Sequence, residues 1–123
     1  MDPKEIVRKW FDQWSIGDPS LLPISDTFSH TSPFGTIEGK KAYFLLVEAN
    51  REKFLGHRFE IHDAIYESER ACVRYTAIQE DHRLEVSEWF YLKDDLIETI
   101  VSYYHIGEVR EDRKLAGPGD KSL

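Results

Sequence analysis

The chain has 123 residues and a formal net charge of -7, so it is long enough for one domain with its own core and is not a basic protein. Its 16 lysines and arginines are scattered among 23 acidic residues, and we expect no nucleic-acid partner, because binding to phosphates needs a basic patch. No apolar run approaches the roughly 20 residues that span a bilayer. The N-terminus also lacks the basic and then apolar pattern of a signal peptide, so we expect a soluble cytoplasmic protein with no membrane partner.

A first helix is predicted from residue 2 to about residue 15. Asp2 can cap it, and Pro3 suits its first position, where a missing amide hydrogen costs nothing. Apolar residues recur at spacings of three and four and form a buried stripe of Ile6, Val7, Trp10, Phe11 and Trp14. Gly17 ends the helix. Core packing is the favoured interpretation of Trp14.

The segment from residue 29 to residue 39 is predicted to contain the end of a strand, a bend and the start of a second helix. Pro33 and Gly35 bend the chain. If the preceding residues are extended, His30 and Ser32 share one face and point into the space between helix and sheet. The second helix is predicted from residue 40 to about residue 54, with Phe44 on its broad apolar face.

Beyond Gly56 the hydrophobic period changes to two. Strands are predicted at residues 58–67, 71–79, 84–93 and 96–105, and the short turns between them imply an antiparallel meander. Helices followed by strands define an α+β class, with a curved antiparallel sheet wrapped around the N-terminal helices as a cone-shaped barrel. We expect one domain over residues 1–106 and a flexible, charged tail over residues 107–123.

This order of elements carries a family resemblance. A helix ends at the Gly17-Asp18 pair, the bend Ser-Pro-Phe-Gly follows at residues 32–35, and Gly39 opens the second helix before the four strands. Over roughly residues 2–106 the chain resembles the SnoaL-like and ketosteroid isomerase-like branch of the nuclear transport factor 2-like superfamily, whose fold is also called cystatin-like. The resemblance leaves the activity open, because this fold hosts enzymes, binding modules and transport factors.

Glu88 is the first candidate catalytic residue. It alternates with the apolar residues Val86 and Phe90 on one strand face, and burial of a carboxyl group raises its pKa. By the resemblance, it occupies the position of the protonated aspartic acid in the oxyanion hole of ketosteroid isomerases. A solvent-exposed glutamate, or one paired with an arginine, is the alternative.

His30 is the second candidate catalytic residue. By the resemblance, Ser32 stands where ketosteroid isomerases have a proton-shuttling aspartate, and a hydroxyl group cannot shuttle protons unaided at neutral pH. His30 could replace that base, with Ser32 as an orienting residue, or it could be an ordinary packed histidine. Trp10 stands where those enzymes have a tyrosine that donates a hydrogen bond to the substrate oxygen, and an indole N–H could do the same.

The last predicted strand supplies further candidates. Ile97, Thr99, Val101, Tyr103 and His105 alternate on one face, which the resemblance implies is the cavity side, although core packing is the simpler interpretation of Tyr103. The full set of predicted ligand-binding residues is Trp10, Ser32, Phe44, Phe90, Thr99, Val101 and Tyr103. The opposite sheet face would carry an aromatic surface that predicts a homodimer, made by Trp89, Tyr91, Ile100 and Tyr104.

Two classes of function follow from these residues. The first is cofactor-independent acid/base chemistry, of an isomerase or cyclase type, on a hydrophobic carbonyl compound in an apolar pocket. The alternative is a module without catalysis that binds a hydrophobic small molecule, or another protein through the aromatic sheet face. We expect no cofactor, and no metal, because His57, His62 and His82 form no tight pair on one face. The single cysteine, Cys72, is interpreted as a strand residue.

Overall fold

The computed structural model describes residues 2–105, 107, 109, 111–113 and 115, and it begins with the predicted first helix. This helix, α1 (Pro3–Ile16), starts at Asp2, whose carboxylate accepts a hydrogen bond of 2.9 Å from the amide of Glu5. It ends at Gly17, which has the left-handed φ of 80° that favours glycine. A 3-10 turn, η1 (Pro19–Leu21), leads from α1 into the sheet. The predicted start and end signals of this helix are therefore confirmed.

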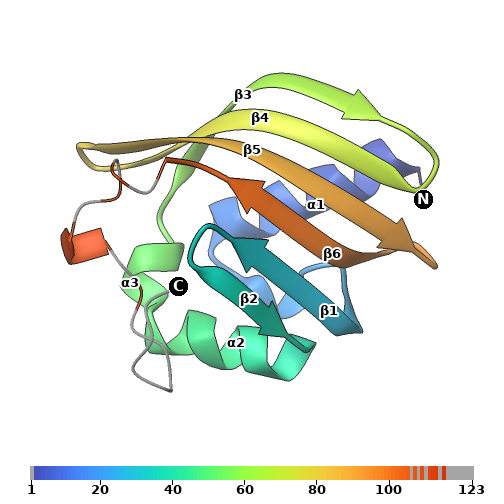
Figure 1. The fold of residues 1–123 in the computed structure, drawn as a ribbon, viewed down its shortest axis with the longest axis horizontal. Coiled ribbons are helices and arrows are strands. Elements are labelled where there is room, and N and C mark those ends of the chain that lie inside the picture. Colours follow the sequence, from blue (N-terminus) through green and yellow to red (C-terminus); the bar gives the residue numbers. More distant parts are fainter. Residues whose placement is uncertain (1, 106, 108, 110, 114, 116–123) are drawn as a thin grey trace.

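The sheet has six strands in the order β2-β1-β6-β5-β4-β3 (Figure 1). The strands are β1 (Ile24–Ser32), β2 (Gly35–Glu38), β3 (Arg58–Tyr66), β4 (Arg70–Gln79), β5 (His82–Lys93) and β6 (Leu96–Tyr103). From β3 to β6 each strand pairs antiparallel with the next, so the predicted meander is confirmed. β1, however, pairs parallel with β6, so the sheet is mixed, and the short strand β2 was not predicted.

The second helical segment is interrupted where one continuous helix was predicted. α2 (Lys40–Ala49) ends at Asn50, and α3 (Arg51–Phe54) starts directly after it. Asn50 is buried, and its side-chain nitrogen donates a hydrogen bond of 2.9 Å to the carbonyl of Leu46. An asparagine bonded to the preceding turn competes with the regular helix pattern, which accounts for the break.

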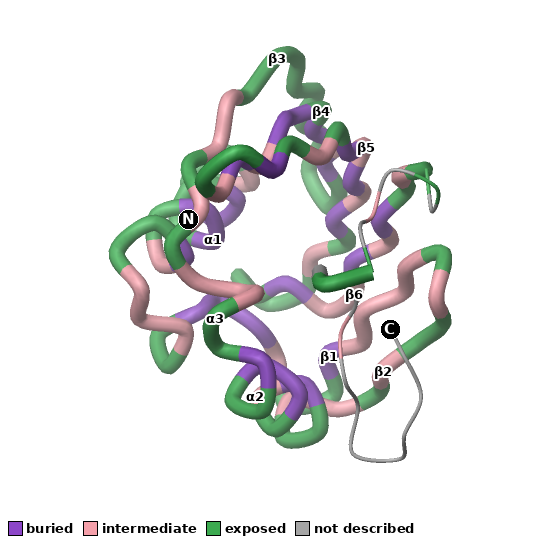
Figure 2. Tube along the Cα trace, turned by 90° about the vertical axis from the view of Figure 1, so that its left-hand side faces the viewer, coloured by how far each residue is buried: buried purple, intermediate pink, exposed green. Residues whose placement is uncertain are grey.

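The core fills the space between the curved sheet and the helices. In Figure 2 the strands curve from β3 at the top to β2 at the lower right, while α1 and the α2–α3 segment lie on the other side of the interior. Fully buried side chains come from all of these layers, including Val7, Phe28, Val47, Phe90 and Ile97. The α+β class with a curved sheet around the helices is therefore confirmed, and among the described strands the two edge strands, β2 and β3, do not pair to close a barrel.

A β-bulge in β6 changes which of its side chains face the core. Leu92 of β5 pairs with Ile97, but Tyr91 pairs with Thr99, so Glu98 is an extra residue. The Glu98 carboxylate is held by the hydroxyl groups of Ser25 and Thr27, at 2.8 and 2.5 Å. Because side chains alternate along a strand, one extra residue reverses the faces beyond it.

The predicted cavity side of β6 is therefore wrong beyond the bulge. Ile100 and Ser102 are buried, whereas Thr99, Val101 and Tyr103 lie on the outer face, with Tyr103 59% exposed. The predicted outer position of Ile100 is wrong for the same reason. His105 follows the strand and is exposed.

The predicted tail over residues 107–123 falls largely outside the described residues. Within the described part, η3 (Glu111–Arg113) forms one 3-10 turn, and Val109 and Leu115 line the central cavity. None of the described helices is long and apolar enough to cross a membrane.

Candidate functional site

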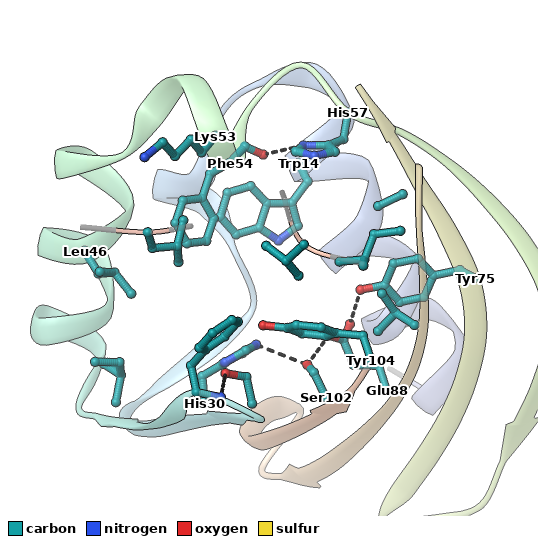
Figure 3. A pocket seen from close by; sticks show the side chains of 18 of the residues that line it. Trp14, His30, Leu46, Lys53, Phe54, His57, Tyr75, Glu88, Ser102 and Tyr104 are labelled. Atoms are coloured by element: carbon teal, nitrogen blue, oxygen red, sulfur yellow. Dashed lines mark hydrogen bonds between the residues drawn. The ribbon is translucent and has the colours of Figure 1, made fainter. Parts of the chain in front are cut away.

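A cavity of about 210 Å³ lies between the concave face of the sheet and the helices (Figure 3). Most of its wall is aromatic or aliphatic, with Trp10 and Trp14 of α1, Phe54 of α3 and Phe59 of β3 among the lining residues. The polar lining residues are fewer than the apolar ones. They are His30, Ser32, Glu88, Ser102, Tyr43, Tyr75 and Tyr104, and also Lys53, His57 and His82.

Four of the predicted site residues line this cavity, namely Trp10, His30, Ser32 and Glu88. The other five do not. Phe90 is completely buried beneath the aromatic rings of α1, and Phe44 is half-buried on the far side of α2, where Lys40 lies 5.9 Å from its ring. Thr99, Val101 and Tyr103 face outward because of the bulge at Glu98. The predicted cavity positions of these five residues are therefore corrected.

A continuous chain of hydrogen bonds joins His30 to Glu88 and Tyr75 (Figure 3). The Ser102 hydroxyl donates to Glu88 Oε2 at 2.5 Å, and its oxygen lies 3.3 Å from Nε2 of His30. The Tyr75 hydroxyl donates to Glu88 Oε1 at 3.1 Å. Strand register creates this chain, since Glu88 pairs with Ser102 across β5 and β6, and His30 lies on β1 beside β6.

Burial shifts the pKa values of Glu88 and His30, two titratable members of this hydrogen-bonded chain, in opposite directions. Glu88 is only 3% exposed, and burial raises the pKa of its carboxyl group to about 7, although the hydrogen bonds from Ser102 and Tyr75 oppose the rise. Burial lowers the pKa of His30 to about 4. At neutral pH the imidazole is therefore uncharged, and Glu88 is the group that changes its protonation state.

Aromatic rings hold His30 in place. The ring of Tyr43, on α2, stacks on the imidazole with a centroid distance of 5.6 Å and an interplanar angle of 27°. Phe28, two residues earlier on the same face of β1, lies 6.4 Å from the imidazole ring and is completely buried. These contacts fix the orientation of the imidazole, which a proton-transferring side chain requires.

Tyr104 supplies a phenol group to the same end of the cavity. It is half-buried just past the end of β6, and Figure 3 shows its ring extending toward the side of the cavity that holds His30. Burial raises the pKa of its hydroxyl group, while a hydrogen bond with Ser32 opposes the rise and the negative charge of Glu88 adds to it. The predicted orienting residue Ser32 therefore acts on Tyr104, and its oxygen also accepts a hydrogen bond of 3.2 Å from the amide of Phe34.

Sequence reasoning missed Ser102, Tyr75, Tyr43 and Tyr104 as cavity residues. Tyr75 could have been found, because it alternates with the apolar residues Ala71 and Val73 on the inner face of β4. The bulge hid Ser102 and Tyr104, since without it both would face outward. Among the residues that the structure describes, no group of three or more His, Cys, Asp or Glu side chains is placed to hold a metal ion.

The fold is that of a nuclear transport factor 2-like protein. The chain is similar to a protein of this type from Cytophaga hutchinsonii, of unknown function, with a TM-score of 0.70 and 15% identity over 83% of this chain and 88% of the other. A family model described as a SnoaL-like domain matches residues 7–100, and the chain belongs to this family.

Two further solved structures share the fold. One, from Kribbella flavida, is named a ketosteroid isomerase and has a TM-score of 0.68 and 15% identity over 82% of this chain and 76% of its own. Another, from Silicibacter sp., is named a polyketide cyclase and has a TM-score of 0.68 and 19% identity over 85% of this chain and 90% of its own. At such identities these likenesses establish the fold alone. No protein with a curated description matches the sequence.

Proposed function

We propose that the chain binds a hydrophobic carbonyl compound in this cavity and acts on it by acid/base chemistry without a cofactor. The observation that carries this proposal is the hydrogen-bonded chain from His30 through Ser102 to Glu88, set in the wall of a largely apolar cavity. A buried carboxyl group with a raised pKa is costly for the fold and is typical of sites that transfer protons.

The hydrogen bonds that link His30 to Glu88 explain how His30 can act as a base despite its low pKa. An imidazole with a pKa of about 4 holds a proton weakly. Because Nε2 of His30 faces Ser102, Nδ1 is the nitrogen that meets the ligand. When Nδ1 takes a proton from the carbon next to the carbonyl, the Nε2 proton can move to Ser102 and the Ser102 proton to Glu88. His30 is then neutral again, and the proton is stored on Glu88, whose pKa is about 7.

The electron pair of the broken C–H bond moves to the carbonyl oxygen and forms an enolate. We assign the hydrogen bond to this oxygen to the hydroxyl group of Tyr104, and its position in the lining at the same end of the cavity supports this role. The role of Trp10 as a second donor stays a prediction, and it requires the indole N–H to point toward this oxygen, since a single N–H donates in one direction. The step needs no electron acceptor, which fits chemistry without a cofactor.

The size of the cavity limits the ligand. An apolar cavity of roughly 150 Å³ holds benzene in another protein. The cavity of about 210 Å³ in this chain therefore suits a compound of one or two rings, or a short chain, rather than four fused rings. The alternative, a binding module without catalysis, predicts a ligand of the same size but no proton transfer.

The catalytic proposal predicts proton exchange that a binding module does not catalyse. In D₂O the chain is expected to speed exchange of the methyl protons of 2-acetylnaphthalene, measured by NMR. The rate should rise with pH through about 7, because only ionised Glu88 can accept the relayed proton. His30→Gln should abolish the effect, and Ser102→Ala should lower it by roughly 100-fold, within the range of general acid/base contributions.

The control is Ser87→Ala, since Ser87 lies on β5 next to Glu88 but on the opposite face. Binding of the ketone without any acceleration of exchange would contradict the catalytic proposal and leave the binding module. An exchange rate that is equally high in Ser102→Ala would contradict the relay.

We also propose a homodimer through the outer face of the sheet. The register aligns Ile65, Cys72, Trp89 and Val101 across four neighbouring strands, and Ile65 is 69% exposed. This apolar row supports the proposal, because a monomer seldom exposes so much connected apolar surface. Of the residues predicted for the interface, Trp89 and Tyr91 lie on this face, whereas Tyr104 lines the cavity.

Val101→Glu is expected to convert this dimer to a monomer, because it places a charge at one end of the apolar row, directly beside Trp89. Analytical ultracentrifugation measures the change in mass. Leu45→Glu is the matched control, since Leu45 is exposed on α2 away from the sheet. A wild-type chain that sediments as a monomer would contradict the proposed dimer.

A further inference from the structure

Basic side chains gather at the end of the cavity opposite the His30 and Glu88 pair. Lys53 of α3, His57 before β3, and His82 at the start of β5 all line the cavity. Figure 3 shows Lys53 and His57 on one side of the cavity and His30, Ser102 and Glu88 on the other. The proposed acid/base chemistry uses none of the three basic residues.

Strand β5 connects the two ends. Its inward-facing residues Glu88, Val86, Leu84 and His82 all line the cavity, in the order carboxyl, apolar, apolar, imidazole. His82 and Glu88 are six positions apart on this strand, so the strand separates the imidazole from the carboxyl group along the cavity wall. The cavity is therefore elongated, with polar groups at both ends and apolar residues between them.

The charge of the lining contrasts with the charge of the protein. The chain has a net charge of -7, yet among the described lining residues the only carboxyl group is Glu88, at the far end. The other end combines an ammonium group with two imidazoles that are half-buried or buried. In a partly desolvated site, a hydrogen bond to an ionised partner is about twice as strong as a neutral one, so this end favours an anion.

We propose that the ligand of this cavity is an elongated hydrophobic carboxylic acid, whose carboxylate binds Lys53, His57 and His82. This inference rests on the proposed function, since it places the reacting carbonyl of the same molecule beside His30 and Tyr104. The apolar middle of the cavity binds the body of the ligand. The acid group fixes the direction of entry, so that the carbonyl end reaches the proton-transferring residues.

The test compares two ligands that differ only in charge. The probe is 6-acetyl-2-naphthoate, which carries a ketone and a carboxylate at opposite ends of two rings, and its neutral partner is 6-acetyl-2-naphthamide. Isothermal titration calorimetry at pH 7 measures both affinities. We expect the carboxylate to bind at least about tenfold more tightly than the amide, which corresponds to one charge-assisted hydrogen bond.

Substitutions at the basic end should remove this preference. Lys53→Met and His57→Gln are expected to reduce the affinity for the carboxylate about tenfold each, while the affinity for the amide stays the same. Lys41→Met is the matched control, because Lys41 is exposed on α2 and lies outside the cavity. It should leave both affinities unchanged. His82→Gln provides a second route if a variant at Lys53 or His57 fails to fold.

The outcomes separate this inference from the proposed function. Equal affinities for acid and amide would overturn the carboxylate site and leave the hydrophobic pocket standing. A preference for the acid that survives in Lys53→Met, His57→Gln and His82→Gln would also overturn it. If neither ligand binds, both this inference and the proposed function are wrong.

Discussion

Glu88→Gln is expected to stabilise the protein at pH 8, although it replaces a residue at the centre of the candidate site. The carboxyl group titrates near pH 4.5 in the unfolded chain and near pH 7 in the folded one. The folded state therefore binds the proton more tightly, and stability falls as the pH rises from about 4.5 to about 7. Above pH 7 the buried carboxylate costs about 3 kcal/mol, which glutamine avoids.

Urea denaturation at pH 5 and pH 8 measures this effect. The variant should differ little from the wild type at pH 5 and should exceed it in free energy of unfolding by up to about 3 kcal/mol at pH 8. Glutamine can still accept a hydrogen bond from Tyr75 and donate one to Ser102, so little bonding is lost. Glu85→Gln, at an exposed position of the same strand, is the control. A variant less stable than the wild type at pH 8 would contradict the buried, partly protonated carboxyl group.

The contribution of His30 to the free energy of unfolding should depend on pH in the opposite way. Its pKa is near 6.5 in the unfolded chain and about 4 in the folded one, so stability falls as the pH falls through this range. The contributions of His30 and Glu88 therefore have opposite slopes between about pH 4.5 and 6.5. In the wild type the two contributions to the dependence of stability on pH largely cancel. In the variant Glu88→Gln only the contribution of His30 remains, so it can be measured there.

Phe90→Ala is expected to lower the free energy of unfolding by about 3–5 kcal/mol, the usual cost of removing a buried phenylalanine. Its ring is completely buried and lies 6.2 Å from Trp10 and 6.1 Å from Phe11, so truncation leaves a void in the centre of the core. Against a typical total of 5–15 kcal/mol, this loss is large. Chemical denaturation followed by circular dichroism measures it.

Phe44→Ala provides the comparison, because Phe44 is the same residue type on the outer side of α2. It is half-buried, so we expect a loss of only about 1 kcal/mol. Both residues were predicted from the sequence to bind the ligand. Equal losses in the two variants would contradict the core position of Phe90.

Local signals in the sequence predicted the order and type of most elements. The cap at Asp2, the end at Gly17 and the change of period after Gly56 each have a local physical cause. The shared face of His30 and Ser32 follows from the alternation of side chains, and the burial of Glu88 follows from its apolar neighbours. These three residues line the cavity as the pattern predicted.

The predictions that were wrong depend on contacts between residues far apart in the sequence. The extra residue at Glu98 is held by Ser25 and Thr27, more than 70 positions earlier in the chain, so no local pattern in β6 reveals it. That single residue moved Ser102 and Tyr104 into the cavity and Thr99, Val101 and Tyr103 out of it. The parallel pairing of β1 with β6 is equally distant in sequence, and the meander alone does not imply it.

This parallel pairing also has a consequence for the order of folding. Glu88 meets Tyr75 and Ser102 through adjacent hairpins, over sequence separations of 13 and 14 residues, whereas His30 meets Ser102 over 72 residues. Closing a long loop costs more entropy than closing a hairpin, and parallel pairings form slowly. The meander can therefore bring Glu88 together with Tyr75 and Ser102 before β1 docks, and His30 joins the site in a late step of folding. The hydrogen bonds of Glu88 to Tyr75 and Ser102 are therefore expected to form before the bond between His30 and Ser102.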